Sequence, residues 1–403
     1  MKGDDFLLVS KTKHGDWFSL TSIRNGERLK EIRKKESFYC PECEEEVILK
    51  IGSKRIPHFA HKKDASCSES YERESEYHLK GKLRLFEWLN SLGLTPQLEP
   101  FYKEISQRPD VGFMHNGVHY AIEFQCSVIP EELFVKRTEN YYKAEILPIW
   151  IMAGKNIKRK GNYRTELTGF DYLFLSKNDS EKWILPAFCP VTNTLIIVNH
   201  ILPISVKNSI AQFSVMDINT ASLANLIQPN CSRLFNIEDW QREIRKAKNI
   251  TLSLYGSHQN KFLQELYTHS LIPSLLPPEI GLPVKHAPLI ETPAIVWQSY
   301  LYMDLLSHKQ CFSLHEIHRS FFRRVSKKDV KIRNLPLNRN GDVFAAVKEY
   351  IDLLVKTNRL DNVNHDFFKK DIPITIQDNQ VKQVEMEREF YQKYGKIIME
   401  NLK

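Results

Sequence analysis

The sequence lacks long apolar runs. No stretch reaches the roughly 18 consecutive apolar residues that a membrane-spanning helix needs, and the charged start, Met1 to Asp5, has no apolar core of a secretory signal. We therefore expect a cytoplasmic protein. Internal repeats and low-complexity tracts are also absent, which argues against a repeat architecture.

A disulfide framework is missing too. The seven cysteines are an odd number and are scattered along the chain. We expect four of them to be free thiols in packed positions: Cys126, Cys189, Cys231 and Cys311.

The other three cysteines lie near two histidines. Cys40-x-x-Cys43 forms a turn whose two sulfurs can point at one ion, and His58, His61 and Cys67 follow within the span of a zinc-ribbon-like knuckle. We predict a structural zinc ion bound by Cys40, Cys43, His61 and Cys67, with His58 as the alternative histidine. Ordinary free cysteines beside a polar strand are the competing interpretation.

An excess of one charge is nearly absent, because 57 basic residues face 49 acidic ones. Such a small excess matters only where it is clustered, and three basic clusters are visible, over 24–36, 155–164 and 309–333. Aromatic residues interleave the last cluster, as in phosphate tracks with base stacking. The DNA-binding candidates are Lys158, Arg159, Lys160, Arg323 and Arg324; solvated faces are the alternative.

Two short strands carry the residues that point most directly to chemistry. Arg108-Pro109-Asp110-Val111 is followed after a His115-Asn116-Gly117 turn by Ala121 to Ser127, and Asn-Gly favours a two-residue hairpin. Side chains alternate along the second strand, so Glu123 and Gln125 share one face. A carboxylate on each strand with a polar residue two places beyond the second is the layout of PD-(D/E)xK nucleases, with Gln in the usual Lys position.

These residue types suit phosphodiester cleavage. Mg²⁺ binds through one or two carboxylates and keeps several waters, and Asp110 and Glu123 can supply those carboxylates. The bound metal lowers the pKa of an attacking water. Gln125 could orient that water, although an amide cannot act as a charged lysine would. A surface hairpin with one solvated face is the other interpretation.

An amphipathic helix is predicted over 75–92, from the apolar spacing of Leu79, Leu83, Phe86 and Leu89. Three polar residues lie in or beside its apolar stripe: Glu76, His78 and Lys82. Polar groups there are costly unless paired, so Glu76 could be a third acidic ligand and His78 or Lys82 could lie near the phosphate. Alternatively, Lys82 extends to solvent and His78 is a satisfied core histidine.

A second helix over 131–142 and a buried strand over 147–152 complete an α/β core with the site at the strand edge. Arg137 and Tyr141 are four residues apart on this helix, and we predict both as DNA contacts. A surface salt bridge with Glu132 or Glu139 is the alternative for Arg137.

For the rest of the chain, the sequence allows only a coarser prediction of the elements. Thr192-Asn193-Thr194 suggests a hairpin, residues 237–271 a mostly helical stretch, and six prolines over 272–293 a semi-rigid spacer. We predict three helices, over 294–307, 313–324 and 342–357, and then a strand pair over 367–376. This order fits a winged-helix module, or a helical domain that only packs on the nuclease-like domain or contacts another protein. Residues 381–403 read as a closing amphipathic helix.

At 403 residues we expect more than one core. The predicted segments are a strand-rich part with the zinc knuckle over 1–70, a nuclease-like domain over 71–180, a hairpin and helical region over 181–272, a proline-rich linker over 273–293, and a helical C-terminal domain over 294–403.

Five segments taken together resemble the CoiA-like competence proteins of Gram-positive bacteria. They are Cys40-Pro41-Glu42-Cys43, His58 to His61, His78 with Lys82, Arg108 to Val111 and Glu123 to Ser127. The resemblance covers roughly residues 25 to 155. It implies a cytoplasmic protein of natural transformation with an α/β, restriction-endonuclease-like core, preceded by a small zinc-ribbon-like segment and followed by a mostly helical C-terminal region.

The resemblance also implies a role in recombining imported single strands into the chromosome. Two functions are compatible with it: a nuclease that uses Mg²⁺ or Mn²⁺ on single-stranded or branched DNA, or a non-cleaving DNA-binding factor that assists the recombinase.

Overall fold

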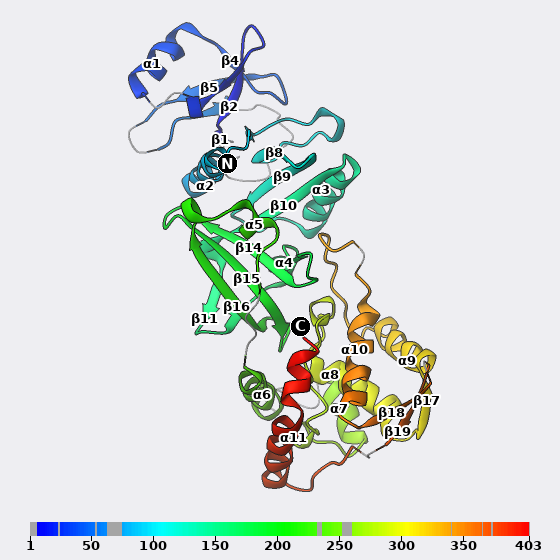
Figure 1. The fold of residues 1–403 in the computed structure, drawn as a ribbon. Helices are drawn as coiled ribbons and strands as arrows, with labels where there is room; N and C mark the ends of the chain where they lie inside the picture. The colour runs from blue at the N-terminus through cyan, green and yellow to red at the C-terminus, as the bar shows by residue number, and fades with distance from the viewer. Residues whose placement is uncertain are drawn as a thin grey trace. The chain divides into compact units, whose positions relative to one another are not determined.

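The computed structural model describes residues 6–22, 25–52, 55–62, 75–231, 236–251, 260–339, 341–364, 366–371 and 374–402 (Figure 1). The chain forms two compact units. Unit 1 contains residues 1–157, 185–198 and 213–230, and unit 2 contains residues 158–184, 199–212 and 231–403. Strands β14 (Trp183–Cys189), β15 (Thr194–Pro203) and β16 (Asn208–Asp217) have residues in both units.

Unit 1 begins with a six-stranded sheet. Its strands are β1 (Phe6–Leu7), β2 (Val9–Thr12), β3 (Trp17–Ser19), β4 (Phe38–Tyr39), β5 (Glu46–Lys50) and β6 (His58–His61), in the order β1-β6-β5-β4-β2-β3, and helix α1 (Gly26–Lys35) follows β3. Residues of β5 are alternately exposed and buried, as expected for a strand with one packed face. Phe18, Phe38 and Phe59 pack together and build the core beneath the sheet.

The predicted α/β core follows. It consists of α2 (Glu76–Ser91), β7 (Gln97–Leu98), β8 (Val111–His115), β9 (Val118–Gln125), α3 (Glu131–Lys143) and β10 (Ile146–Ala153), with the strands in the order β14-β10-β9-β8-β7. Both predicted helices and the buried strand are confirmed. Asn116 and Gly117 have positive φ angles of 49° and 77°, which confirms the tight hairpin between β8 and β9.

The two helices cover opposite faces of this sheet. Phe124 of β9 lies against Gly81 of α2, where even a Cβ atom would collide with its ring. Ala121, three residues earlier in β9, packs with Tyr141 of α3. Because neighbouring side chains of a strand point to opposite faces, α2 packs on one side and α3 on the other. The helix α3 is also the crossover that lets β9 and β10 run parallel.

Unit 2 combines short strands with a mostly helical region. Its elements are β11 (Lys158–Lys160), β12 (Arg164–Glu166), α4 (Gly169–Tyr172), β13 (Ser176–Lys177), α6 (Ile237–Lys246), α7 (Lys261–Thr268), α8 (Ala294–Leu301), β17 (Cys311–Ser313), α9 (Leu314–Ser326), α10 (Val343–Lys356), β18 (Leu360–Asn364), β19 (Phe367–Lys370) and α11 (Gln380–Glu400); α5 (Leu223–Ile227) belongs to unit 1. Asn193, with a φ of 58°, lies in the turn between the neighbouring strands β14 and β15, which confirms that hairpin.

The proline-rich segment lies inside the core of unit 2, so its prediction as a spacer is wrong. The side chains of Leu276, Ile280, Leu282 and Val284 are fully buried in the main hydrophobic cluster. The Gln298 side-chain oxygen accepts hydrogen bonds from the backbone of Gly281 and Leu282, at 2.7 and 3.0 Å. An irregular segment can be buried here because its polar backbone groups find such partners. The other predicted domain boundaries remain predictions.

The C-terminal elements largely follow the predicted order. A capping box between Ser313 and Glu316 begins α9, as expected. The strand pair is β18 with β19, so it starts earlier than predicted, and β17 joins it in the order β17-β19-β18. The closing helix α11 buries Phe390, Tyr394 and Ile398. The winged-helix interpretation stays a prediction.

Candidate active site

Three acidic residues lie in one row of backbone positions across neighbouring strands of unit 1. Val111 pairs with Leu98 on one side and with Ile122 on the other. One residue along, Asp110 therefore lies between Glu99 and Glu123, and the Glu99 amide donates to the Asp110 carbonyl at 3.0 Å. All three residues are buried. Asp110 and Glu123 are thus backbone neighbours on adjacent strands, and Glu99 is the neighbour of Asp110 on the other side. The meeting of the Asp110 and Glu123 carboxylates at one metal ion stays a prediction.

The Asp110 carboxylate is held from α2. Its Oδ1 lies 3.0 Å from Nζ of Lys82, and its Oδ2 lies 3.2 Å from Nε2 of His78 and accepts the Phe124 amide at 2.7 Å. Burial alone would raise the pKa of Asp110, but the charges of Lys82 and His78 and these hydrogen bonds outweigh it and hold the pKa well below its usual range. Asp110 is therefore an ionised buried carboxylate.

The Glu123 carboxylate is held from α3. Its Oε1 accepts a hydrogen bond of 2.6 Å from Arg137 and another from the hydroxyl of Tyr141. Burial and the negative charge of Glu123 raise the pKa of Tyr141 well above its usual value, so the phenol stays a donor. Tyr141 is fully buried, so its prediction as a DNA contact is wrong. Arg137 forms an ion pair, as the alternative interpretation held, but with Glu123 in place of Glu132 or Glu139.

Glu99 was missed by the sequence analysis. Its side chain is 1% exposed, and its Oε1 accepts a hydrogen bond of 2.9 Å from Lys82. Its Oε2 accepts the backbone amides of Leu8 and Val9 at 2.8 and 3.3 Å. No periodic pattern surrounds this residue in the sequence. The only signal was a carboxylate between the short strand β7 and Pro100.

Two other predicted site residues have different surroundings. Gln125 is buried and donates to the Ser127 carbonyl at 2.9 Å, so its amide turns toward its own strand end. Glu76 is the exposed first residue of α2. Within the described ranges, no hydrogen bond or ion pair connects Glu76 with Asp110 or Glu123. His78 and Lys82 are both at the site, and Lys82 is buried between two carboxylates, so it does not extend to solvent.

The donor set of this site suits a hard cation. Asp110 and Glu123 supply carboxylate oxygens, the ligand type that Mg²⁺ prefers. With Glu99 there are three carboxylates against two permanently charged cations, Lys82 and Arg137, while His78 is charged only when protonated. A divalent cation would offset the remaining negative charge.

A separate group of potential metal ligands lies in the N-terminal sheet. Ligand atoms of Cys40, Cys43 and His61 lie within 4.8 Å of one another, and in the described part of the chain this is the one group of three or more such ligands. His58 is on the other face of β6, where Nδ1 donates to the Ile56 carbonyl at 2.8 Å and the ring packs at a tilt against Phe6, with the ring centroids 4.2 Å apart. The structure therefore favours His61 over His58. Cys67 lies outside the described residues.

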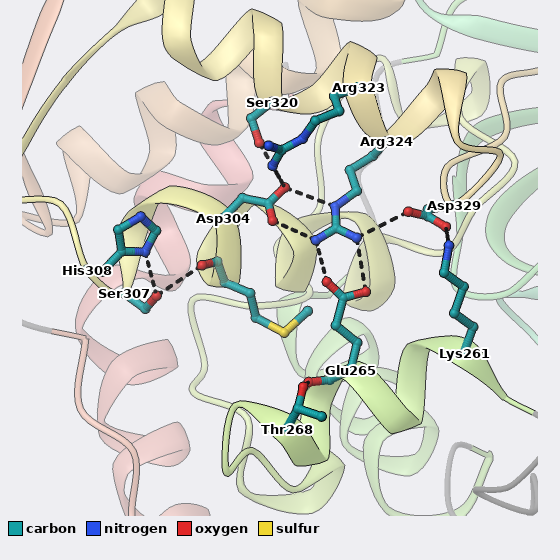
Figure 2. Close-up of polar contacts among 11 residues, drawn as sticks. Lys261, Glu265, Thr268, Asp304, Ser307, His308, Ser320, Arg323, Arg324 and Asp329 are labelled. Atoms are coloured by element: carbon teal, nitrogen blue, oxygen red, sulfur yellow. Dashed lines mark hydrogen bonds and ion pairs between the residues drawn. The ribbon is translucent and has the colours of Figure 1, made fainter.

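The DNA-binding candidates in unit 2 differ among themselves. Lys158, Arg159 and Lys160 are exposed along β11, and Lys160 forms an ion pair with Glu166. Arg324, in contrast, is buried and binds three carboxylates: Asp304 at 2.6 Å, Glu265 at 2.5 Å and Asp329 at 3.1 Å (Figure 2). Its prediction as a DNA contact is wrong, because a guanidinium already bound to three carboxylates has no donor to spare for a phosphate. Arg323 is half-exposed and pairs with Asp304 at 3.0 Å.

Among the helices that the structure describes, none is long and apolar enough to cross a membrane.

Comparisons with known proteins agree along the chain. Three family models match: the N-terminal domain of competence protein CoiA over residues 21–70, its nuclease-like domain over 74–231 and its C-terminal domain over 235–380. The competence protein CoiA of Bacillus subtilis (strain 168) is 29% identical over 343 residues, which cover 84% of this chain and 90% of that protein. No solved structure matches significantly. The chain therefore belongs to the CoiA family of competence proteins and carries that family's nuclease-like domain.

Proposed function

We propose that this protein is a metal-dependent DNA nuclease that acts in the cytoplasm during natural transformation, on single-stranded or branched intermediates formed when imported DNA recombines with the chromosome. The observation that carries the proposal is the buried row of Glu99, Asp110 and Glu123, held by basic side chains from both covering helices. Buried charges are costly, and a cluster of this kind in a nuclease-like domain is best explained by chemistry at that place.

Asp110 and Glu123 would hold Mg²⁺ or Mn²⁺. When bound, such an ion acidifies a coordinated water and stabilises negative charge on the phosphate. Lys82 places an ammonium group 3.0 Å from Asp110 and can supply the positive charge that Gln125 cannot. Arg137 brings a second cation to Glu123, and Tyr141 fixes that carboxylate as a donor that does not ionise.

A non-cleaving accessory factor that recruits or assists the recombinase is the second candidate. It is favoured by Gln125, whose amide is bonded to the Ser127 carbonyl, and by Lys82 and Arg137, which both contact carboxylates of the protein itself. A site of this kind could bind DNA backbone without turnover.

Cleavage assays with matched variants test the proposal. Labelled single-stranded, duplex and branched DNA would be incubated with Mg²⁺ or Mn²⁺ and with the wild-type protein, Asp110→Asn, Glu123→Gln or the control Glu132→Gln, whose side chain is exposed on α3. We expect cutting by the wild type and the control, and none by the two site variants at unchanged folding. Tight DNA binding without cutting by any of the four proteins would favour the accessory factor.

We also propose that Cys40, Cys43 and His61 bind a structural zinc ion, with Cys67 as the fourth ligand. Two thiolates and an imidazole so close together are a typical zinc set, and four protein ligands would leave no open position for catalysis. Metal analysis of purified protein tests this. Zinc should be present in the wild type and in the control Cys311→Ser, whose cysteine is exposed, and lost in Cys43→Ser. Equal zinc in all three would contradict the assignment.

A further inference from the structure

Glu99 occupies an unusual position for a carboxylate. It is almost completely buried, and its φ of 47° is one that residues other than glycine rarely adopt. A strained backbone persists only where the surroundings enforce it, and such strain clusters at functional sites. The strain ends β7 and directs the Glu99 carboxylate toward Lys82 and the N-terminal strands.

Each oxygen of this carboxylate has a different task. Oε1 accepts the Lys82 ammonium, whose Nζ at the same time lies 3.0 Å from Asp110. Lys82 thus uses two of its three donors to bridge two carboxylates. An ammonium group on a flexible four-carbon chain needs such a second anchor to stay in one place.

The other oxygen, Oε2, is bound by the N-terminal sheet. The amides of Leu8 and Val9 donate to it; Leu8 connects β1 with β2, and Val9 is the first residue of β2. Strand β1 pairs with β6 through Leu7 and Phe59, and β6 also carries His61 of the potential metal group. A continuous set of contacts therefore leads from this sheet through Glu99 and Lys82 to Asp110.

We propose that Glu99 is a positioning residue of the nuclease site: it holds Lys82 against Asp110 and is itself fixed by the Leu8 and Val9 amides of the N-terminal sheet. This inference rests on the proposed nuclease function. It makes the N-terminal sheet a part of the site, because without those two amides the buried carboxylate would have Lys82 as its main remaining partner.

The experiment compares Glu99→Gln with Lys82→Met, the double variant and a matched control, Glu104→Gln, whose carboxylate is exposed five residues away. Glu99→Gln should lower kcat by about 10- to 100-fold, with little change in KM. This is the effect typical of residues that orient a functional side chain without contacting the substrate. In the Lys82→Met background the same substitution should change the rate by less than about twofold, because Glu99 acts through Lys82. Independent, multiplying effects would overturn the proposal.

Two measurements do not depend on turnover. Amine-reactive labelling followed by mass spectrometry should modify Lys82 faster in Glu99→Gln than in the wild type or Glu104→Gln, because the ammonium loses one anchor. Amide hydrogen exchange over residues 6–12 should be faster in Glu99→Ala and unchanged in Lys82→Met, where Glu99 keeps its amide partners. Unchanged labelling and exchange in the Glu99 variants would refute the positioning role.

These readouts separate the two hypotheses. If the wild-type protein cuts no DNA with either metal, the nuclease function fails, while labelling and exchange still decide whether Glu99 positions Lys82. If the wild type cuts and Glu99→Gln cuts equally well, the nuclease function stands and the positioning role is wrong.

Discussion

Two buried cations of this protein bind several carboxylates each, in two different units. Lys82 in unit 1 contacts Glu99 and Asp110, and Arg324 in unit 2 contacts Asp304, Glu265 and Asp329. Both are less than one-tenth exposed. The two clusters differ in their charge balance and in the secondary-structure elements that supply the carboxylates.

The Arg324 cluster is neutral and links helices. Three cations, Lys261, Arg323 and Arg324, face three carboxylates that come from α7, from the π-helix that continues α8 and from the turn after α9 (Figure 2). Burial disfavours the charged guanidinium, but hydrogen bonds to Asp304 and Glu265 outweigh it and raise the pKa of Arg324. Such a cluster fixes the packing of helices and leaves no net charge for a ligand.

The Lys82 cluster retains negative charge at the ends of strands. Glu99 and Asp110 exceed the permanent cation Lys82 by one charge, the pair of Glu123 and Arg137 adds no net charge, and these residues lie where the sheet carries the proposed nuclease site. The comparison teaches that a buried cation surrounded by carboxylates is ambiguous by itself. Charge balance and the elements that supply the carboxylates separate a structural cluster from a candidate active site.

The largest expected effect is on the stability of unit 2. Arg324→Met should lower the free energy of unfolding by about 3–5 kcal/mol, because it leaves buried carboxylates without their cation. Arg323→Met should cost less than about 1 kcal/mol, since its side chain is half-exposed. Urea unfolding followed by circular dichroism measures both. Equal, small losses of unfolding free energy in the two variants would mean that Arg324 does not hold the three carboxylates together.

Asp110→Asn should give the reverse pattern. The amide has almost the same shape, so unfolding should change less than in Arg324→Met. Cleavage should fall by at least about 100-fold, because a metal-binding carboxylate contributes several kcal/mol to the transition state. Initial rates on labelled DNA, beside urea unfolding of the same preparation, check both expectations. A large loss of stability with an unchanged cleavage rate would mean that Asp110 has a structural role, like the carboxylates around Arg324.

Sequence patterns predicted the elements of the site well. The Asn116-Gly117 turn, the apolar stripe of α2 and the strand that carries Glu123 depend on local chemistry, and each is found as expected. Lys82 and His78 stood out because they interrupt an apolar stripe. These signals are local, so they survive in a single sequence.

Partners that come from distant parts of the chain were not predictable in this way. Glu99 meets Leu8 across 91 residues, and Arg324 meets Glu265 across 59. A basic run around Arg324 resembles a DNA-binding face until the carboxylates that bind it are known. The buried proline-rich segment shows the same limit, because its partner Gln298 belongs to a later helix.

Substitution of exposed cations should have a smaller effect, and this effect should be on DNA binding. The triple substitution of Lys158, Arg159 and Lys160 by alanine should weaken DNA binding about tenfold at low salt and reduce the salt dependence of binding, because fewer counterions are released. Lys393→Ala with Lys396→Ala, two lysines of the exposed face of α11, is the control for loss of charge. Fluorescence anisotropy over a range of salt concentrations measures the effect. Equal weakening by the triple variant and the control would remove β11 from the DNA-binding surface.

The smallest expected difference concerns acid stability. The pKa values of Asp110 and Asp304 are both lowered: burial opposes this in each case, and Lys82 with His78, or Arg324, outweighs it. In the unfolded chain these groups bind protons near pH 4, before the folded protein does, so their contribution to stability is present above that pH and is lost as the pH falls toward the folded values. Asp110→Asn and Asp304→Asn should each flatten the fall in unfolding free energy between pH 6 and 3.

Mg²⁺ should then distinguish the clusters, because an ion that binds only the folded protein raises its stability. We expect that rise at pH 7 in the wild type and in Asp304→Asn but not in Asp110→Asn; the same rise in Asp110→Asn would show that the ion binds elsewhere.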